Sequence, residues 1–197
     1  MKNKDILTRN RIASNIPLMI EGRKLPNEMQ AKVMIMRVHY AKAAKSFADD
    51  MQEILKGLKP EGFDEKSMSV MKMEEIDKRR KAAEEWKEGD TDKDGKPVEK
   101  PSMPSKEELE EADNARASKD EYDKQLAELN NAYNAAYMDK LEEECGIVDR
   151  MFTEGEFVEL IGMIGIEGTM EITVDDNKQE VSKESFISMI AAWLVKE

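Results

Sequence analysis

The chain has 197 residues, of which 38% are charged and only 6% are aromatic, and its formal net charge is −12. This composition is lean for a compact globule and typical of helical arms, so we expect one domain or a small domain with a long extension. The single cysteine, Cys145, excludes an internal disulfide framework and fits a reducing compartment. Because the first thirty residues lack a signal-peptide pattern and no stretch approaches the ~18 apolar residues of a membrane span, we expect a cytoplasmic protein without membrane contact.

Charge is unevenly distributed along the chain. Residues 1–45 carry +7, so the remaining 152 residues carry −19. A basic end on an acidic body favours binding to the acidic surface of another subunit, including a second copy, or to nucleic acid. A solvated end without a specific partner is the simpler alternative.

Residues 1–26 are predicted to form a basic, extended arm, because Pro17, Gly22 and Pro26 interrupt any long helix. The arm is partly apolar, so it either docks on a neighbouring subunit or folds back on its own helices. For the first case we predict an interface that also includes the following helix. Its residues are Arg9, Arg11, Ile16, Leu18, Met19, Arg23, Lys24, Met29, Val33, Met36, Tyr40 and Phe47.

The first half of a helical arm is predicted over residues 27–88. Asn27 is a good N-cap, and Gly57 with Pro60 ends the first helix. Its apolar residues recur in steps of three and four, with one slip at Met51, which is the spacing of a coiled-coil seam. The seam comprises Met29, Val33, Met36, Tyr40, Ala43, Phe47, Met51, Ile54 and Leu58.

A second helix is predicted from about Glu65 to Lys87, with a weak seam and a highly charged stretch over residues 74–85. We expect this stretch to be solvated or to face a partner. The seam residues are Met68, Met71, Ile76, Ala83 and Trp86.

Residues 89–105 contain three prolines and two glycines and are predicted to be a disordered acidic loop. The segment that begins at Asp90 matches the first six positions of an EF-hand calcium loop. Position 8 is Pro97 and position 12 is Pro101, so the rest of the calcium motif fails. A solvated acidic turn is therefore favoured over a metal site.

The second half of the arm is predicted over residues 106–146, as one helix that Ser105 and Glu108 cap and Gly146 ends. It carries a second stripe of similar spacing, so we expect a long helical hairpin. Pairing within one chain and pairing between chains both remain open. The stripe comprises Tyr122, Leu126, Leu129, Tyr133, Ala136 and Lys140, with Leu141 beside it.

Residues 147–197 are predicted to form a compact α+β domain. A capping box at Thr153 opens a short helix over 155–164, and the alternation over 169–174 predicts a strand. A turn over 175–178 leads to a second strand over 179–181, and Ser182 caps a helix over 183–195. That helix is expected to bury Phe186, Met189, Ile190, Trp193 and Leu194. The predicted fold is mainly α, with a long helical hairpin and a small α+β domain that contains a short β-hairpin.

Catalytic, cofactor and metal residues are not expected. The only histidine, His39, excludes schemes that need two, and Cys145 follows three glutamates, whose charge opposes the thiolate that a nucleophile needs. No phosphate-binding or dinucleotide motif occurs. The basic arm lacks aromatic residues for base stacking, and the acidic body repels phosphates. We therefore expect neither an enzyme nor a sequence-specific nucleic-acid binder.

The layout of the chain resembles small virion proteins of tailed phages that form rings at the neck or tail below the portal. The parts that carry the resemblance are the arm Met1–Pro26, the stripes Met29–Leu58 and Tyr122–Leu141, and the compact end Ile147–Glu197. The resemblance implies a structural subunit of a homo-oligomeric ring in the virion. Its partners would be copies of itself and other virion proteins, such as a portal or an adjacent ring, with DNA passing nearby. Head-to-tail contacts between the basic arm and an acidic neighbouring surface would close the ring.

Two other functions fit the same sequence. A helical assembly chaperone or adaptor would bind partners transiently through its methionine-rich seams. A coiled-coil scaffolding dimer would pair the stripes between chains.

Overall fold

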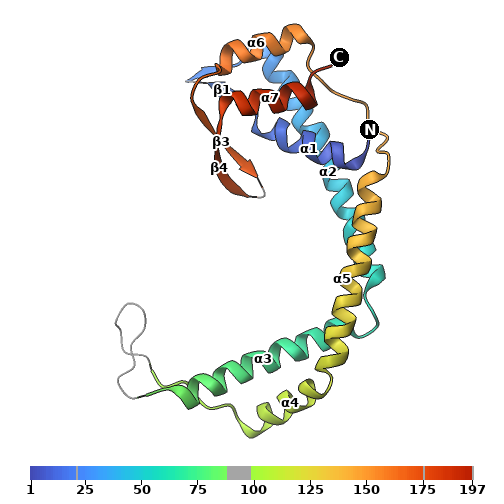
Figure 1. The fold of residues 1–197 in the computed structure, drawn as a ribbon, viewed down its shortest axis with the longest axis vertical. Coiled ribbons are helices and arrows are strands. Elements are labelled where there is room, and N and C mark those ends of the chain that lie inside the picture. The colour runs from blue at the N-terminus through green and yellow to red at the C-terminus, as the bar shows by residue number, and fades with distance from the viewer. Residues whose placement is uncertain (21, 88–98, 175, 197) are drawn as a thin grey trace. The chain divides into compact units, whose positions relative to one another are not determined.

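The computed structural model describes residues 1–20, 22–87, 99–174 and 176–196. In these residues the chain is mainly α-helical, with seven helices and two short antiparallel hairpins, which confirms the predicted fold class (Figure 1). The elements in chain order are α1 (Asn3–Asn15), β1 (Met19–Ile20), β2 (Arg23–Lys24), α2 (Asn27–Leu58), α3 (Phe63–Glu85), α4 (Lys106–Ala117), α5 (Lys119–Glu142), α6 (Glu154–Ile164), β3 (Thr169–Val174), β4 (Asn177–Ser182) and α7 (Lys183–Leu194).

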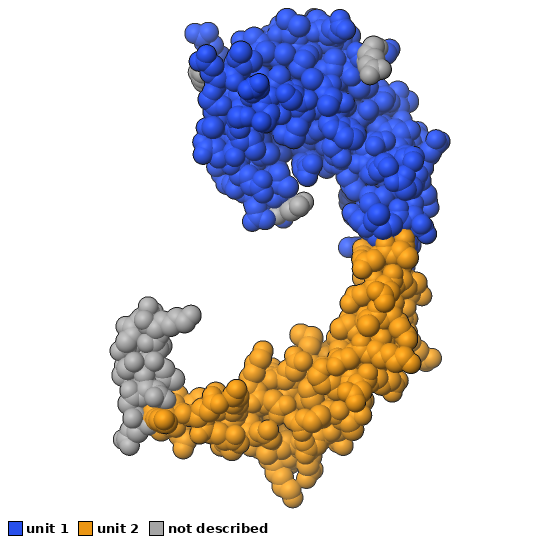
Figure 2. Space-filling view, in the orientation of Figure 1, with its two compact units in different colours: residues 1–54, 136–197 blue, residues 55–135 orange. Residues whose placement is uncertain are grey.

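The chain forms two compact units, coloured separately in Figure 2. Unit 1 combines both ends of the chain, Met1–Ile54 and Ala136–Glu197, and unit 2 is the middle, Leu55–Ala135. The compact domain therefore extends beyond the predicted residues 147–197. Its core also contains buried residues from the first third of the chain, beginning with those of α1.

The N-terminal segment is a helix where an extended arm was predicted. The prolines and glycine that argued against a helix all lie after α1, which ends at Asn15. Its start is capped by the backbone N–H of Lys2, which donates to the Asp5 carboxylate at 3.0 Å. Ile6, Ile12 and Ala13 on this helix are buried. The segment thus folds back on its own chain, which was the second of the two outcomes left open.

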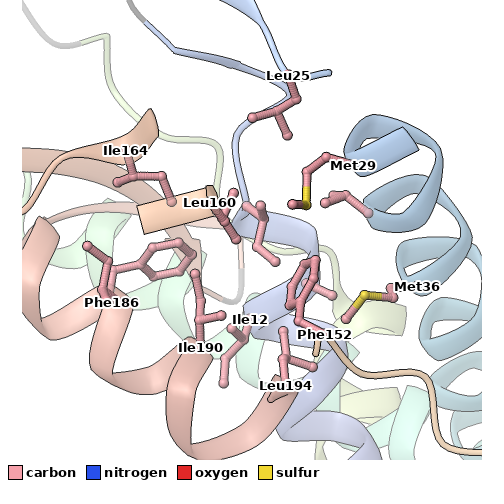
Figure 3. Packing of buried hydrophobic residues seen from close by; sticks show 14 of the residues in the cluster. Ile12, Leu25, Met29, Met36, Phe152, Leu160, Ile164, Phe186, Ile190 and Leu194 are labelled. Atoms are coloured by element: carbon pink, nitrogen blue, oxygen red, sulfur yellow. The ribbon is translucent and has the colours of Figure 1, made fainter. Parts of the chain in front are cut away.

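Helix α2 matches the predicted span, and the first seven seam residues, Met29 to Met51, are all buried. The N-terminal half of the seam joins α1, α6, β3 and α7 in one apolar cluster of 16 buried residues (Figure 3). Tyr40, Phe152 and Phe186 supply its aromatic side chains, all nearly inaccessible to solvent. This cluster contains most of the buried apolar residues of unit 1 and is its main source of stability.

Two side chains fasten the end of α1 to its neighbours. Half-buried Arg37 on α2 donates from Nε to the carbonyl oxygen of Ala13 at 3.1 Å and from Nη2 to that of Ile16. The Ala13 carbonyl also accepts from the Ile16 N–H at 3.3 Å, whereas the bond to the Ile16 carbonyl satisfies an acceptor beyond the end of the helix, and burial lowers the pKa of Arg37. The Asn15 amide bonds both backbone groups of Thr173, at 2.9 and 2.7 Å, and so extends the β3 edge.

The C-terminal hairpin pairs β3 with β4 from Thr169↔Ser182 to Val174↔Asn177. The second strand, Asn177–Ser182, is longer than the predicted 179–181, because each β3 residue gains a cross-strand partner. Ser182 then caps α7, as predicted, and the Thr153–Glu156 capping box opens α6. On α7, Phe186, Ile190 and Leu194 are buried, whereas Met189 and Trp193 are half-buried against the same cluster.

The two long helices pair within one chain, which answers the question that the stripes left open. In unit 1 the rings of Phe47 on α2 and Tyr137 on α5 meet edge to face, with centroids 5.6 Å apart. The Lys140 ammonium lies 3.0 Å from the Asp50 carboxylate, so the polar member of the second stripe forms an ion pair. Along that stripe only Leu129 is buried and the other residues are half-buried.

Unit 2 contains the pair α3 and α4 with a small cluster of five buried residues. The predicted face of α3 is partly wrong: Met68 and Met71 are exposed, whereas Val70 and Met73 are buried with Ile76. Residues 70, 73 and 76 follow the same helical period as the predicted residues, so the period fits either face of α3. Contact with α4 decides which of the two faces is buried.

The predicted single helix over residues 106–146 is two helices that break at Ser118. The Ser118 hydroxyl donates to the carbonyl oxygen of Ala115 at 3.0 Å, a local bond that competes with helix continuation. The Ser105–Glu108 capping box at the start of α4 is confirmed. The calcium-like motif that begins at Asp90 lies outside the described residues.

Candidate protein-interaction surfaces

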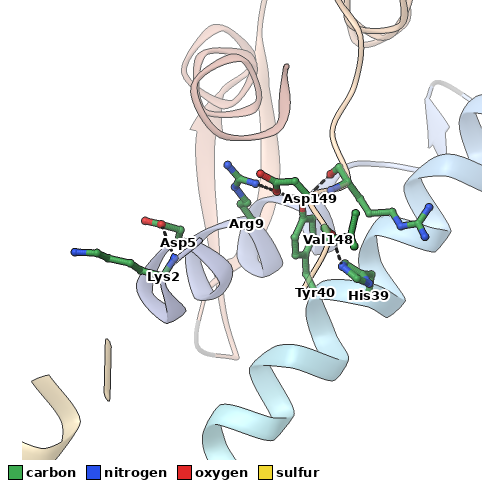
Figure 4. Close-up of polar contacts among 8 residues, drawn as sticks. Lys2, Asp5, Arg9, His39, Tyr40, Val148 and Asp149 are labelled. Atoms are coloured by element: carbon green, nitrogen blue, oxygen red, sulfur yellow. Dashed lines mark hydrogen bonds and ion pairs between the residues drawn. The ribbon is translucent and has the colours of Figure 1, made fainter. Parts of the chain in front are cut away.

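The basic N-terminal segment is paired with the acidic C-terminal part of its own chain. Lys2 and Lys4 both donate to the Glu142 carboxylate at 2.5 Å, and Arg9 pairs with Asp149. Figure 4 shows Arg9 directed at Asp149 near Tyr40. Part of the charge that the sequence led us to expect between subunits, on Lys2, Lys4 and Arg9, is therefore paired within unit 1.

The pairing at Glu142 has an electrostatic signature. Hydrogen bonds from Lys2 and then Lys4 stabilise the carboxylate and lower the pKa of Glu142 from its ordinary value of 4.5 to about 2. The same bond raises the pKa of Lys2. A neighbouring backbone hydrogen bond strengthens this attachment of the N-terminal segment, since the Asn3 N–H donates to the Glu143 carbonyl at 3.0 Å. The N-terminus is thus held at the end of α5.

Tyr40 and His39 hold the segment after α5 against α2. The Tyr40 hydroxyl donates to the Arg150 carbonyl at 2.6 Å and accepts from the Arg150 N–H at 3.3 Å. His39 Nε2 lies 2.8 Å from the Val148 carbonyl oxygen (Figure 4). Both side chains therefore contact backbone groups and position the segment that follows α5.

Six residues of the predicted interface are buried within unit 1, five of them in its main cluster. They are Ile16, Met29, Val33, Met36, Tyr40 and Phe47. Leu18 is half-buried against the same cluster, and Arg9 is paired. The predicted interface residues that remain exposed are Arg11, Met19, Arg23 and Lys24.

A second apolar face of α2 was missed in the sequence. Val38 is 69% exposed, and Met34 and Ile35 are each 50% exposed. With two exposed alanines they follow the helical period and lie opposite the buried seam. We call this surface the outer face of α2; it comprises Ala31, Met34, Ile35, Val38 and Ala41. The signal was present in the sequence, because these residues continue the apolar composition of the helix beyond one seam.

The outer face adjoins a shallow cavity. This cavity, of about 460 Å³, is lined by Ala31 and Ile35 from α2 and by Met151 from the segment before α6. Nearby, Val148 is 73% exposed. The outer face therefore borders a recess, also lined by Glu28, Lys32, Asp149 and Arg150, that could receive a side chain from another molecule.

A larger groove lies between α3 and α4 in unit 2. The α3–α4 groove has a volume of about 1170 Å³ and is crossed by an ion pair between Lys72 and Glu111 at 2.7 Å. Its apolar lining residues are Met68, Met71, Met73, Ile76, Ala112 and Ala115. The sequence predicted that Met68 and Met71 belong to a packed seam, whereas in the structure they are exposed and line the groove. The groove itself can therefore be recognised only in the structure.

Within the described ranges, no group of three or more His, Cys, Asp or Glu side chains is arranged to hold a metal ion. No helix in that part of the chain combines the length and apolarity that crossing a membrane requires. Comparison with family models, curated proteins and solved structures finds no match. Function is therefore inferred from the outer face of α2 and the α3–α4 groove.

Proposed function

We propose that this chain is a non-enzymatic structural subunit that self-associates through the outer face of α2. The observation that carries the proposal is the exposure of Met34, Ile35 and Val38 on a helix whose opposite face is already buried. A helix that is apolar on both faces is typical of a position covered on both sides. Contiguous exposed apolar surface marks protein contacts, and a second copy supplies a matching surface.

The charges of α2 favour antiparallel pairing of two copies. Glu28 and Lys42 stand seven residues before and after Ile35, roughly 10 Å along the axis on either side. Neither forms an ion pair within the described residues. An antiparallel crossing centred near Ile35 places Glu28 of one copy opposite Lys42 of the other, twice. A parallel crossing would oppose like charges.

A ring subunit in the neck or tail of a tailed-phage virion is the more specific form of this proposal. Its support is the layout of the chain, with a compact unit formed by both ends and a helical middle. Lys2, Lys4 and Arg9 of the basic segment pair in cis, so the outer face of α2 replaces the segment as the proposed contact between copies. A two-fold pair alone closes at two subunits, and a ring requires one further, head-to-tail contact.

Native mass measured by light scattering tests the proposal. We expect a dimer or larger multimer for the wild type and a monomer for Val38→Asp, because a carboxylate would be buried in the contact. The fold should survive, since Val38 is 69% exposed. Met68→Gln is the matched control, an exposed methionine on unit 2 that should leave the mass unchanged. A wild-type monomer across micromolar to millimolar concentrations contradicts the proposal.

Charge reversal tests the orientation of the pair. Glu28→Lys alone and Lys42→Glu alone should each weaken association, because each opposes like charges. The double variant should recover the wild-type mass, since the two charges are exchanged. If the double variant is weaker than either single variant, the antiparallel arrangement is excluded.

A further inference from the structure

We infer that the α3–α4 groove binds an amphipathic helix of another protein, one whose apolar face is flanked by Lys or Arg. This binding is a second activity, independent of association through α2. Two packed helices bury little apolar surface between them, and here the cluster has only five buried residues. Met68 and Met71 stay 71% and 66% exposed. A third helix in the groove would cover them and complete a three-helix layer.

The dimensions of the groove fit a helix. Its lining runs from Gly62, the residue before α3, to Lys78 on that helix, and on α4 and the residue after it from Glu111 to Ser118. The α3 stretch is roughly 24 Å long, or between four and five helical turns. Methionine side chains adapt to different apolar partners, so the groove requires an apolar face without requiring one particular sequence.

The charges left on the groove are mainly negative. Lys66 is 2.8 Å from Glu121, and Lys72 is paired with Glu111, so both ammonium groups already have carboxylate partners. The remaining charged lining residues are Glu65, Glu74, Glu75 and Lys78, which form no ion pair within the described residues. Three carboxylates and one ammonium group favour the binding of a basic helix over that of an acidic one.

Fluorescence anisotropy with two synthetic peptides tests the inference. The probe is a labelled 18-residue helix of Leu and Lys in amphipathic order, and the matched control has Glu in place of each Lys. We expect saturable binding of the lysine peptide and no binding of the glutamate peptide. Met68→Gln with Met71→Gln should weaken binding at least tenfold and leave the circular dichroism unchanged, because both side chains are exposed.

Two further variants separate this inference from self-association. Val38→Asp should keep the wild-type affinity for the lysine peptide, whatever it does to the native mass. Glu74→Lys with Glu75→Lys should weaken the lysine peptide and admit the glutamate peptide. Equal binding of both peptides, or full affinity in the methionine double variant, overturns the inference. A native mass that falls in that double variant assigns the groove to a second copy and overturns it as well.

Discussion

The two units of this chain are both helical, but different interactions hold them together. The main apolar cluster of unit 1 has 16 buried residues contributed by both ends of the chain. The cluster of unit 2 has five, and ion pairs link its helices, among them Arg79–Glu108 at 2.5 Å and Arg116–Asp77 at 2.8 Å. Buried apolar area scales with stability, whereas exposed ion pairs contribute little. We therefore expect unit 1 to be the more stable unit and unit 2 to be the more sensitive to solvent conditions.

Each unit contains one tryptophan, so the comparison can be measured directly. Trp193 is half-buried against the unit 1 cluster, and Trp86 is half-buried at the end of α3 in unit 2. Trp86→Phe and Trp193→Phe each leave one fluorescent reporter. The predictions below use this pair of backgrounds.

The largest expected effect is on unit 1 from Phe186→Ala. Phe186 is 1% exposed, and its truncation should cost about 3–5 kcal/mol of unfolding free energy. Met73→Ala in unit 2 should cost about 2 kcal/mol, because the cluster is small and the open groove allows collapse. Urea titrations followed at Trp193 and Trp86 measure both. If Phe186→Ala shifts the Trp86 transition as much as the Trp193 transition, the units are not independent.

Arg37→Met should lower the stability of unit 1 by about 2 kcal/mol. Methionine keeps the packing of the side-chain stem but removes the donor to the Ile16 carbonyl, while the Ala13 carbonyl keeps only the Ile16 N–H. The Trp193 midpoint in urea should fall, and the Trp86 midpoint should stay. Lys45→Met is a control on the same helix, because Lys45 pairs with Asp49 at the surface. Equal losses in the two variants would exclude the capping role.

Acid should weaken each unit most strongly through the carboxylate whose pKa is lowered furthest, with Glu156 in unit 1 and Glu121 in unit 2 lowered as well. Glu142 in unit 1 and Glu108 in unit 2 both have a pKa of about 2, well below the ordinary 4.5. For Glu108 the cause is first a hydrogen bond from Arg79 and then one from the Ser105 backbone. A lowered pKa stabilises the fold above pH 4.5, and this contribution is lost as the pH falls from about 4.5 to about 2.

Two glutamine variants assign this acid sensitivity to the units. Glu108→Gln should flatten the pH dependence of the Trp86 transition in that window and leave that of Trp193 unchanged. Glu142→Gln should do the reverse. A pH dependence that persists in both variants would show that other carboxylates dominate.

The smallest expected effect is that of salt. Raising sodium chloride from 0.05 to 1 M should lower the melting temperature of unit 2 by a few degrees, because screening weakens its exposed pairs. Unit 1 should shift less, since its cluster does not depend on charge. Melting curves in the two single-tryptophan backgrounds provide the measurement. A larger shift at Trp193 than at Trp86 would reverse the comparison.

The local features of this chain follow from its sequence. The span of α2, the caps at Ser105, Thr153 and Ser182, and the strand at 169–174 each depend on residues a few positions apart. Capping side chains bond to the backbone three residues on, and helical or strand period is read within one segment. These signals predicted the fold class without knowledge of any long-range contact.

The tertiary structure alone decided what covers each apolar face. The periodicity of residues 1–16 is equally compatible with a free arm and with α1 packed in a core, and the Arg9–Asp149 pair that accompanies the packing joins residues 140 positions apart. For the same reason, the sequence wrongly predicted that Met68 and Met71 are buried in a seam. The exposed apolar residues on the outer face of α2 were not predicted either. Period shows which side chains share a face, but solvent exposure depends on contacts with distant segments, and no local pattern encodes those.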